Sequence, residues 1–147
     1  MTSPLPDQVI DISVQQAWDR LANDPAAVLI DVRTEAEWAF VGTADLASIG
    51  KQPILTEWQT FPDNRRVGDF AERLGQALTK AGVAKTSELL FLCRSGGRSM
   101  MAARTMAAAG FTRCRNVADG FEGQLDPVRH RGRLGGWKAA GLPWVQS

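Results

Sequence analysis

The most informative segment of the sequence is Glu88-Leu-Leu-Phe-Leu-Cys93-Arg-Ser-Gly-Gly-Arg98-Ser99, in which an apolar run meets a glycine-containing turn. Residues 88–92 have the length and apolar character of a buried parallel strand. After the turn, an Ala- and Met-rich stretch continues to Ala109 and stops at Gly110, as a helix with a glycine stop does. The segment therefore predicts a strand, a loop that carries a cysteine, and a helix.

Similar strand and helix patterns lie on both sides of this segment. Two four-residue patterns, Ser13 to Gln16 and Thr34 to Glu37, have the form of capping boxes that open helices. A β-branched run, Ala27–Val32, has the character of a buried parallel strand, and charges follow at its end in Asp31-Val-Arg33. Further predicted elements are a strand over Val9–Ile12, a helix over Asp69–Ala81 that stops at Gly82, and a strand over Arg115–Ala118.

Strands that alternate with helices predict an α/β fold, with a parallel sheet covered by helices on both faces. In such sheets, ligands bind beyond the carboxyl ends of the strands. We therefore expect Asp31, Arg33 and Cys93 to lie together at that edge. The chain has 147 residues, which is ordinary for one domain, and we expect a single domain over residues 1–147.

Composition excludes several classes of function. The formal net charge is +1, so no overall charge draws the chain to nucleic acid or to an anionic membrane. Met1 to Asp11 lacks the pattern of a signal peptide and no apolar run is long enough to span a membrane, which predicts a cytoplasmic protein. Two cysteines without a CxxC pair predict neither disulfides nor a metal site, and we expect no cofactor.

The position of Cys93 predicts a reactive thiol. It precedes a helix, whose terminal amides favour the negatively charged thiolate. Gly96 and Gly97 allow successive backbone N–H groups to converge on one anion, while Arg94 and Arg98 add cationic groups that match sulfonate- or phosphate-like oxygens. The alternative is a buried, inert cysteine, but inert thiols lack electropositive surroundings. The pattern therefore indicates a nucleophile for an anionic substrate.

Four motifs in this order resemble the rhodanese family. They are Val28-Leu-Ile-Asp-Val-Arg-Thr-Glu-Ala-Glu-Trp38, Cys93-Arg-Ser-Gly-Gly-Arg98, Asn116-Val-Ala-Asp-Gly-Phe-Glu-Gly123 and Gly136-Trp-Lys-Ala-Ala-Gly-Leu-Pro-Trp144. The resemblance implies a rhodanese-like fold with a parallel sheet of about five strands flanked by helices. It also implies a thiosulfate sulfurtransferase-like enzyme, in which the cysteine takes sulfane sulfur from a donor and a thiophilic acceptor removes it.

The same resemblance implies roles for the residues of the cysteine loop. Cys93 carries the sulfur as a persulfide, and the loop Arg94, Ser95, Gly96, Gly97, Arg98 and Ser99 binds it. Arg94 is the candidate that binds the donor's oxygens, and a loop that begins Cys-Arg favours thiosulfate over mercaptopyruvate. The implied partners are a small anionic sulfur donor and a thiol or protein acceptor, while nucleic acid and membrane are not expected.

Three residues of the first motif are predicted to support the site. We expect Asp31 to pair with Arg98, and Arg33 to pair with Glu37. The sequence departs from the family after Glu37, because Gly42-Thr-Ala-Asp45 replaces the common Gly-His-Ile-Pro-Gly-Ala. The insert Gly50–Gly68, which contains Trp58 as a candidate substrate contact, either covers the site or forms an ordinary surface loop.

Two other functions fit parts of the pattern. A cysteine phosphatase or arsenate reductase also uses a cysteine, an amide cradle and an arginine, but those phosphatases place five residues between Cys and Arg, and here Cys93 and Arg98 are separated by four. A non-catalytic binding module is the second alternative. We expect Cys114 to be structural, or else a resolving thiol, and His130 to be solvated, although its basic segment 129–133 is also a candidate docking site.

Overall fold

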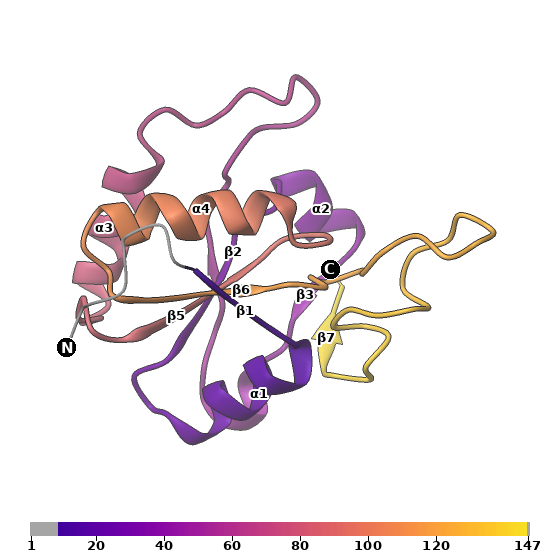
Figure 1. The fold of residues 1–147 in the computed structure, drawn as a ribbon, viewed down its shortest axis with the longest axis horizontal. Helices are drawn as coiled ribbons and strands as arrows, with labels where there is room; N and C mark the ends of the chain where they lie inside the picture. Colours follow the sequence, from indigo (N-terminus) through magenta and orange to yellow (C-terminus); the bar gives the residue numbers. More distant parts are fainter. Residues whose placement is uncertain (1–8, 147) are drawn as a thin grey trace.

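A five-stranded parallel sheet forms the centre of the molecule (Figure 1). The computed structural model describes residues 9–146, and the expectation about the first eight residues lies outside that range. The strands lie side by side in the order β1–β6–β5–β2–β4, which confirms the predicted sheet. Their bounds are β1 (Ile10–Ile12), β2 (Val28–Asp31), β4 (Ile54–Leu55), β5 (Glu88–Leu92) and β6 (Arg113–Val117).

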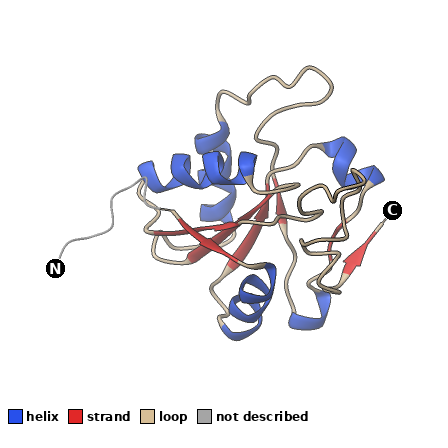
Figure 2. Ribbon diagram, turned by 45° about the vertical axis from the view of Figure 1, so that its right-hand side comes forward, coloured by secondary structure: helices blue, strands red, loops and turns tan. Residues whose placement is uncertain are grey.

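Helices cover both faces of the sheet, as predicted (Figure 2). Helix α1 (Val14–Asn23) packs on one face, while α3 (Phe70–Lys80) and α4 (Gly97–Ala108) pack on the other. The central strand β5 contributes to both cores because successive side chains of a strand point to opposite faces. Leu90 and Leu92 lie in the core beneath α1, and Leu89 and Phe91 lie in the core beneath α3 and α4.

Both predicted capping boxes are present. The Ser13 hydroxyl accepts the backbone N–H of Gln16 at the start of α1, and the Gln16 side chain accepts the backbone N–H of Ser13 in return. The Thr34 and Glu37 side chains make the same exchange at the start of α2 (Glu35–Phe40). The second box orients Glu37 at the carboxyl edge of the sheet, where β2 and β5 end side by side.

Two features differ from the predicted elements. Strand β6 begins at Arg113, two residues before the predicted start, because Arg113 and Cys114 continue the pairing with β5. A second, antiparallel sheet joins β3 (Thr43–Ala44) to β7 (Trp144–Val145), and a short 3-10 helix, η1 (Ala47–Ile49), follows β3. Neither the antiparallel sheet nor the 3-10 helix has a counterpart among the predicted elements, because elements of two or three residues leave no periodic pattern.

The predicted insert contains a projecting arm, residues 56–67, which is the loop at the top of Figure 1. An isolated bridge between Gln59 and Arg66 closes the base of the arm. Trp58 is buried there, edge-on to Phe70 and beneath the Arg66 guanidinium, so it anchors the arm rather than facing a substrate. The suggestion that Trp58 contacts substrate is therefore wrong. In the part of the chain that the structure describes, no helix has the length and apolar character to cross a membrane.

Candidate active site

Cys93 lies immediately after β5 and four residues before the start of α4. Asp31 pairs in register with Leu92, so the ends of β2 and β5 coincide and Asp31, Arg33 and Cys93 share the predicted edge of the sheet. Cys93 is only 1% exposed. Its thiol sits at the N-terminus of a 12-residue helix, where the helix dipole favours negative charge.

Two groups in residues 9–146 hydrogen-bond to the Cys93 sulfur. The backbone N–H of Gly96 donates to Sγ at 3.1 Å, and the Ser99 hydroxyl lies 3.1 Å from the same atom. Gly96 and Ser99 both belong to the predicted loop, and both act on the sulfur directly. The Ser99 hydroxyl also lies 2.5 Å from Asn116 Oδ1, an oxygen that can only accept, so the one hydroxyl proton is donated there and the Ser99 oxygen faces the Cys93 sulfur as an acceptor.

Asn116 is a site residue that the sequence analysis did not single out. The Ser99 hydroxyl lies 2.5 Å from Asn116 Oδ1, and the Asn116 amide donates to Asp11 Oδ1 and to the carbonyl of Gly96. These two hydrogen bonds orient the amide so that its oxygen faces Ser99. Asn116 is the first residue of the third family motif, and that motif could have indicated it as a site residue. Nothing in the sequence indicated Asp11.

The third motif also packs against the back of the cysteine loop. The N–H of Phe121 donates to the carbonyl of Cys93 at 2.8 Å. Gly96 has a positive φ of 103°, and a Cβ at this position would lie 2.2 Å from the carbonyl oxygen of Ala118. A Cβ at Gly120 would lie 2.5 Å from the carbonyl oxygen of Arg94. Both glycines are therefore required for the close approach of these two segments.

Arg98 pairs with Glu37 and not with Asp31, which corrects the first predicted ion pair. Its Nη1 and Nη2 donate to the two carboxylate oxygens at 2.6 and 2.9 Å. Burial by itself raises the pKa of Glu37, but the hydrogen bond and charge of Arg98 outweigh it and hold this pKa below its usual value. For Arg98, burial lowers the pKa, and the carboxylate of Glu37 raises it by more. The pair joins the cysteine loop to α2.

Arg33 pairs with Asp31 and not with Glu37, which corrects the second predicted ion pair. Both side chains are fully buried, and Arg33 Nη2 donates to Asp31 Oδ2 at 2.7 Å. The same nitrogen donates to the carbonyl of Gly42, and the guanidinium stacks on the Phe121 ring at 4.3 Å. These contacts favour the structural role that was predicted for Asp31 and Arg33.

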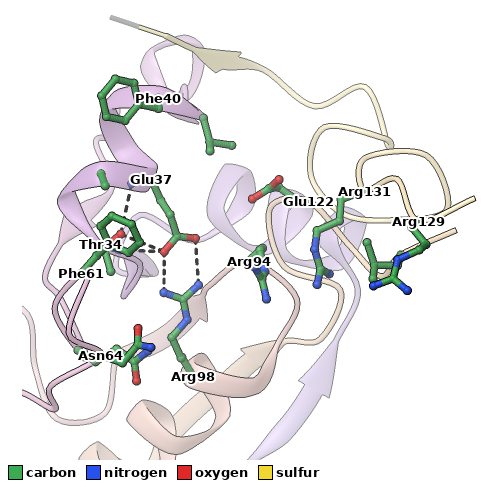
Figure 3. A pocket seen from close by; sticks show the side chains of 14 residues that line it. Thr34, Glu37, Phe40, Phe61, Asn64, Arg94, Arg98, Glu122, Arg129 and Arg131 are labelled. Carbon is green, nitrogen blue, oxygen red and sulfur yellow. Dashed lines mark hydrogen bonds and ion pairs between the residues drawn. The ribbon is translucent and has the colours of Figure 1, made fainter.

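A cavity of about 790 Å³ opens above the cysteine loop (Figure 3). Arg94 and Arg98 line it from the loop, and Phe40 lines it from α2. Phe61 of the arm forms part of the rim, and Leu125 contributes from the opposite segment, residues 122–131. The arm therefore helps to enclose the site, which was one of the two predicted roles of the insert.

The second cysteine has a different environment. Cys114 is buried in β6, where its thiol donates to the carbonyl of Phe111. Burial raises the pKa of this thiol to about 12, and the nearby Arg115 offsets only part of that rise. Cys114 therefore stays protonated, which supports the structural reading. Among the described residues, His130 is exposed, and no group of three or more His, Cys, Asp or Glu side chains is arranged to hold a metal ion.

Comparison with protein families identifies the chain. The model of the STR4 middle domain matches residues 10–147. The chain belongs to the STR4 middle domain family. This is a rhodanese-like family, and rhodanese-like domains of known structure share the fold at about 17% identity. The expected rhodanese-like α/β fold is thus confirmed.

Alignments with individual relatives cover most of the chain. The solved structure of Rv0390 from M. tuberculosis is 46% identical, covers 93% of this chain and 97% of its own, and superposes with a TM-score of 0.81. The uncharacterized protein RP600 homolog of Rickettsia rickettsii is 34% identical over 139 residues, which is 92% of this chain and 97% of that protein. Thiosulfate sulfurtransferase 18 of Arabidopsis thaliana is 29% identical over 121 residues, or 82% of this chain and 81% of that protein.

Proposed function

We propose that this chain is a sulfurtransferase that accepts sulfane sulfur from a thiosulfate-like donor on Cys93 and passes it to a thiol acceptor. The observation that carries the proposal is the environment of the Cys93 sulfur, which receives a backbone N–H from Gly96 and lies beside the Ser99 hydroxyl at the start of α4. The Gly96 N–H and the N-terminus of α4 favour an anionic sulfur. The relationship to thiosulfate sulfurtransferase 18 supports the same chemistry.

The first half of the reaction loads the enzyme. The Cys93 thiolate attacks the outer sulfur of thiosulfate, a new S–S bond forms, and sulfite leaves with the electron pair of the bond that breaks. Arg94 is exposed and lines the cavity beside the loop, so its guanidinium is available to bind the donor's sulfonate oxygens. Arg98 is already held by Glu37, and its role is to fix the end of the loop.

The second half of the reaction removes the sulfur from the enzyme. An acceptor thiolate attacks the outer sulfur of the persulfide, the S–S bond to Cys93 breaks, and Cys93 leaves as a thiolate that the backbone N–H of Gly96 again stabilises. No electrons are gained or lost overall, because sulfane sulfur moves between two thiolates. The 1% exposure of Cys93 limits the access of water and bystander thiols to the S–S bond between transfers.

Intact-mass spectrometry after brief treatment with thiosulfate tests the proposal. Wild type is expected to gain one sulfur, about 32 Da, which a reductant removes. Cys114→Ser is the matched control and is expected to gain the same mass, because Cys114 is the inert thiol. Cys93→Ser is expected to gain none.

The same experiment can overturn the proposal. A folded wild-type chain that gains no sulfur from thiosulfate or from a small persulfide donor would contradict it. An adduct that persists in Cys93→Ser and is lost in Cys114→Ser would assign the chemistry to the wrong cysteine.

A further inference from the structure

The mouth of the cavity carries three exposed apolar side chains from three different segments. Phe40 at the end of α2 is 81% exposed, Phe61 of the arm is 65% exposed, and Leu125 of the 122–131 segment is 44% exposed. All three line the cavity, and Phe40 and Phe61 can be followed in Figure 3. Apolar side chains gathered around a polar cleft are typical of a surface that a partner covers. We call Phe40, Phe61 and Leu125 the apolar rim.

Uncompensated positive charge lies inside this rim. Four arginines and two glutamates line the cavity; Arg98 and Glu37 neutralise each other, and Glu122 offsets one of the three remaining arginine charges. Arg131 is tied to the carbonyl of Gly123, although its charge remains. Within residues 9–146, the side chains of Arg94 and Arg129 have no hydrogen-bond or ion-pair partner, so both are free to bind an anion. The chain as a whole has a net charge of only +1, which makes this concentration of charge local.

The size of the cavity exceeds what the sulfur donor requires. At about 790 Å³, it falls within the range of roughly 300–1,000 Å³ that accommodates drug-sized ligands. A thiosulfate ion is far smaller and would contact Arg94 and the cysteine loop alone. Most of the cavity, including Arg129 and the apolar rim, is therefore left for the second substrate.

We infer that the sulfur acceptor is a protein that presents its cysteine in an acidic segment with apolar neighbours. This inference rests on the proposed function. Acidic side chains complement Arg94 and Arg129, and apolar neighbours of the cysteine cover Phe40 and Phe61. A peptide segment reaches all three parts of the rim at once, whereas a small thiol inside the cavity would leave the most exposed ring, that of Phe40, in water.

The transfer follows the balanced exchange already described. The thiolate of the acceptor's cysteine attacks the outer sulfur of the Cys93 persulfide, and the bond between that sulfur and Cys93 Sγ breaks. The acceptor leaves as a persulfide and Cys93 returns to the thiolate. The docking surface contributes recognition only, by holding the acceptor cysteine above the loop at high effective concentration.

Three blocked peptides test the chemistry of the acceptor. The first is acetyl-Glu-Leu-Cys-Phe-Glu-amide, the second replaces both Glu with Lys, and the third replaces Leu and Phe with Ser. Each peptide is mixed with the persulfide form of the enzyme, and the second-order rate constant of sulfur transfer to the peptide is measured. This rate constant is then divided by the rate constant of sulfur transfer to cyanide. We expect the first peptide to exceed each of the others by about tenfold, because steering by opposite charge and apolar burial both act on it.

Matched variants test the surface. Arg129→Glu is compared with Arg104→Glu, which makes the same charge change at an exposed position of α4 that does not line the cavity. Phe61→Ser is compared with Leu134→Ser, since both side chains are 65% exposed and only Phe61 lines the cavity. We expect Arg129→Glu to abolish the preference for the acidic peptide and Phe61→Ser to abolish the preference for the apolar one, and the two control variants to keep both.

The outcomes separate this inference from the function on which it rests. Rapid transfer to cyanide with equal rate constants for the three peptides would overturn the acceptor assignment and leave the sulfurtransferase intact. Failure of the chain to form a persulfide would overturn both. Inhibition of sulfur transfer by a single-stranded RNA oligonucleotide is compared with inhibition by the first peptide in which serine replaces the cysteine. Stronger inhibition by the RNA would indicate that the arginines bind a nucleic acid, and would also overturn the inference.

Discussion

Replacement of Gly96 by alanine is expected to destabilise the protein, whereas the same change at the next residue is not. Gly96 has a φ of 103°, where an L-residue is strained by about 1–3 kcal/mol. The added Cβ would also lie 2.2 Å from the carbonyl oxygen of Ala118, so the backbone must shift. Together these effects predict a loss of about 3 kcal/mol in the free energy of unfolding.

Gly97→Ala is the matched control. A Cβ at Gly97 would meet nothing within 4 Å, and Gly97 is the first residue of α4, where alanine favours the helix. We expect this variant to be more stable than wild type by about 0.5 kcal/mol, because alanine restricts the unfolded chain and has the higher helix propensity.

Urea unfolding followed by tryptophan fluorescence measures both changes. For a chain of this size, a loss of about 3 kcal/mol corresponds to a fall in melting temperature of about 10 °C, which a thermal scan would detect independently. Equal stabilities for Gly96→Ala and Gly97→Ala would refute the reasoning, since the two substitutions differ only in their backbone conformation and in the approach of Ala118.

Three further predictions concern the ionisable and hydrogen-bonding groups of the site. The pKa of Glu37 is lowered from 4.5 by Arg98, so the stability that this carboxylate contributes is present above pH 4.5 and lost at lower pH. Urea unfolding should therefore give a smaller difference between the free energies of unfolding at pH 7 and pH 3 for Glu37→Gln than for wild type. Cys114, with its pKa of about 12, should resist iodoacetamide at pH 8 until the chain is unfolded, and alkylation of the native protein at the unfolded rate would contradict this. Ser99→Ala should slow persulfide formation by about tenfold, measured by rapid-quench mass spectrometry, because the hydroxyl that joins the Cys93 sulfur to Asn116 no longer fixes the position of the sulfur in the loop; an unchanged rate would show that Ser99 serves only Asn116.

Local sequence patterns were sufficient to predict the elements around the cysteine. The strand over Glu88–Leu92 has the predicted bounds, and both capping boxes form as expected. These predictions succeed because strand burial, helix capping and glycine turns depend on residues only a few positions apart. The position of Cys93 between a strand and a helix follows from the same local patterns.

The partners of the charged and polar side chains were not predictable in this way. Arg98 and Glu37 are 61 residues apart, and the Asn116 amide reaches Asp11 over 105 residues. The edge of the sheet brings two carboxylates and two guanidinium groups together. Each arginine pairs with the carboxylate predicted for the other, because sequence spacing does not specify which carboxylate a guanidinium faces. That choice depends on strand register and on the direction in which α2 leaves the sheet.

The sequence thus determined the order of strands and helices around Cys93 and the position of this cysteine between a strand and a helix, because those follow from short-range chemistry. Tertiary structure alone decided the hydrogen bond from Ser99 to Asn116, the exchange of ion pairs and the cavity between the arm and the 122–131 segment. The two walls of this cavity come from segments about sixty residues apart in the chain, and neither has a periodic pattern. Their approach depends on packing across the whole sheet, which no local pattern encodes.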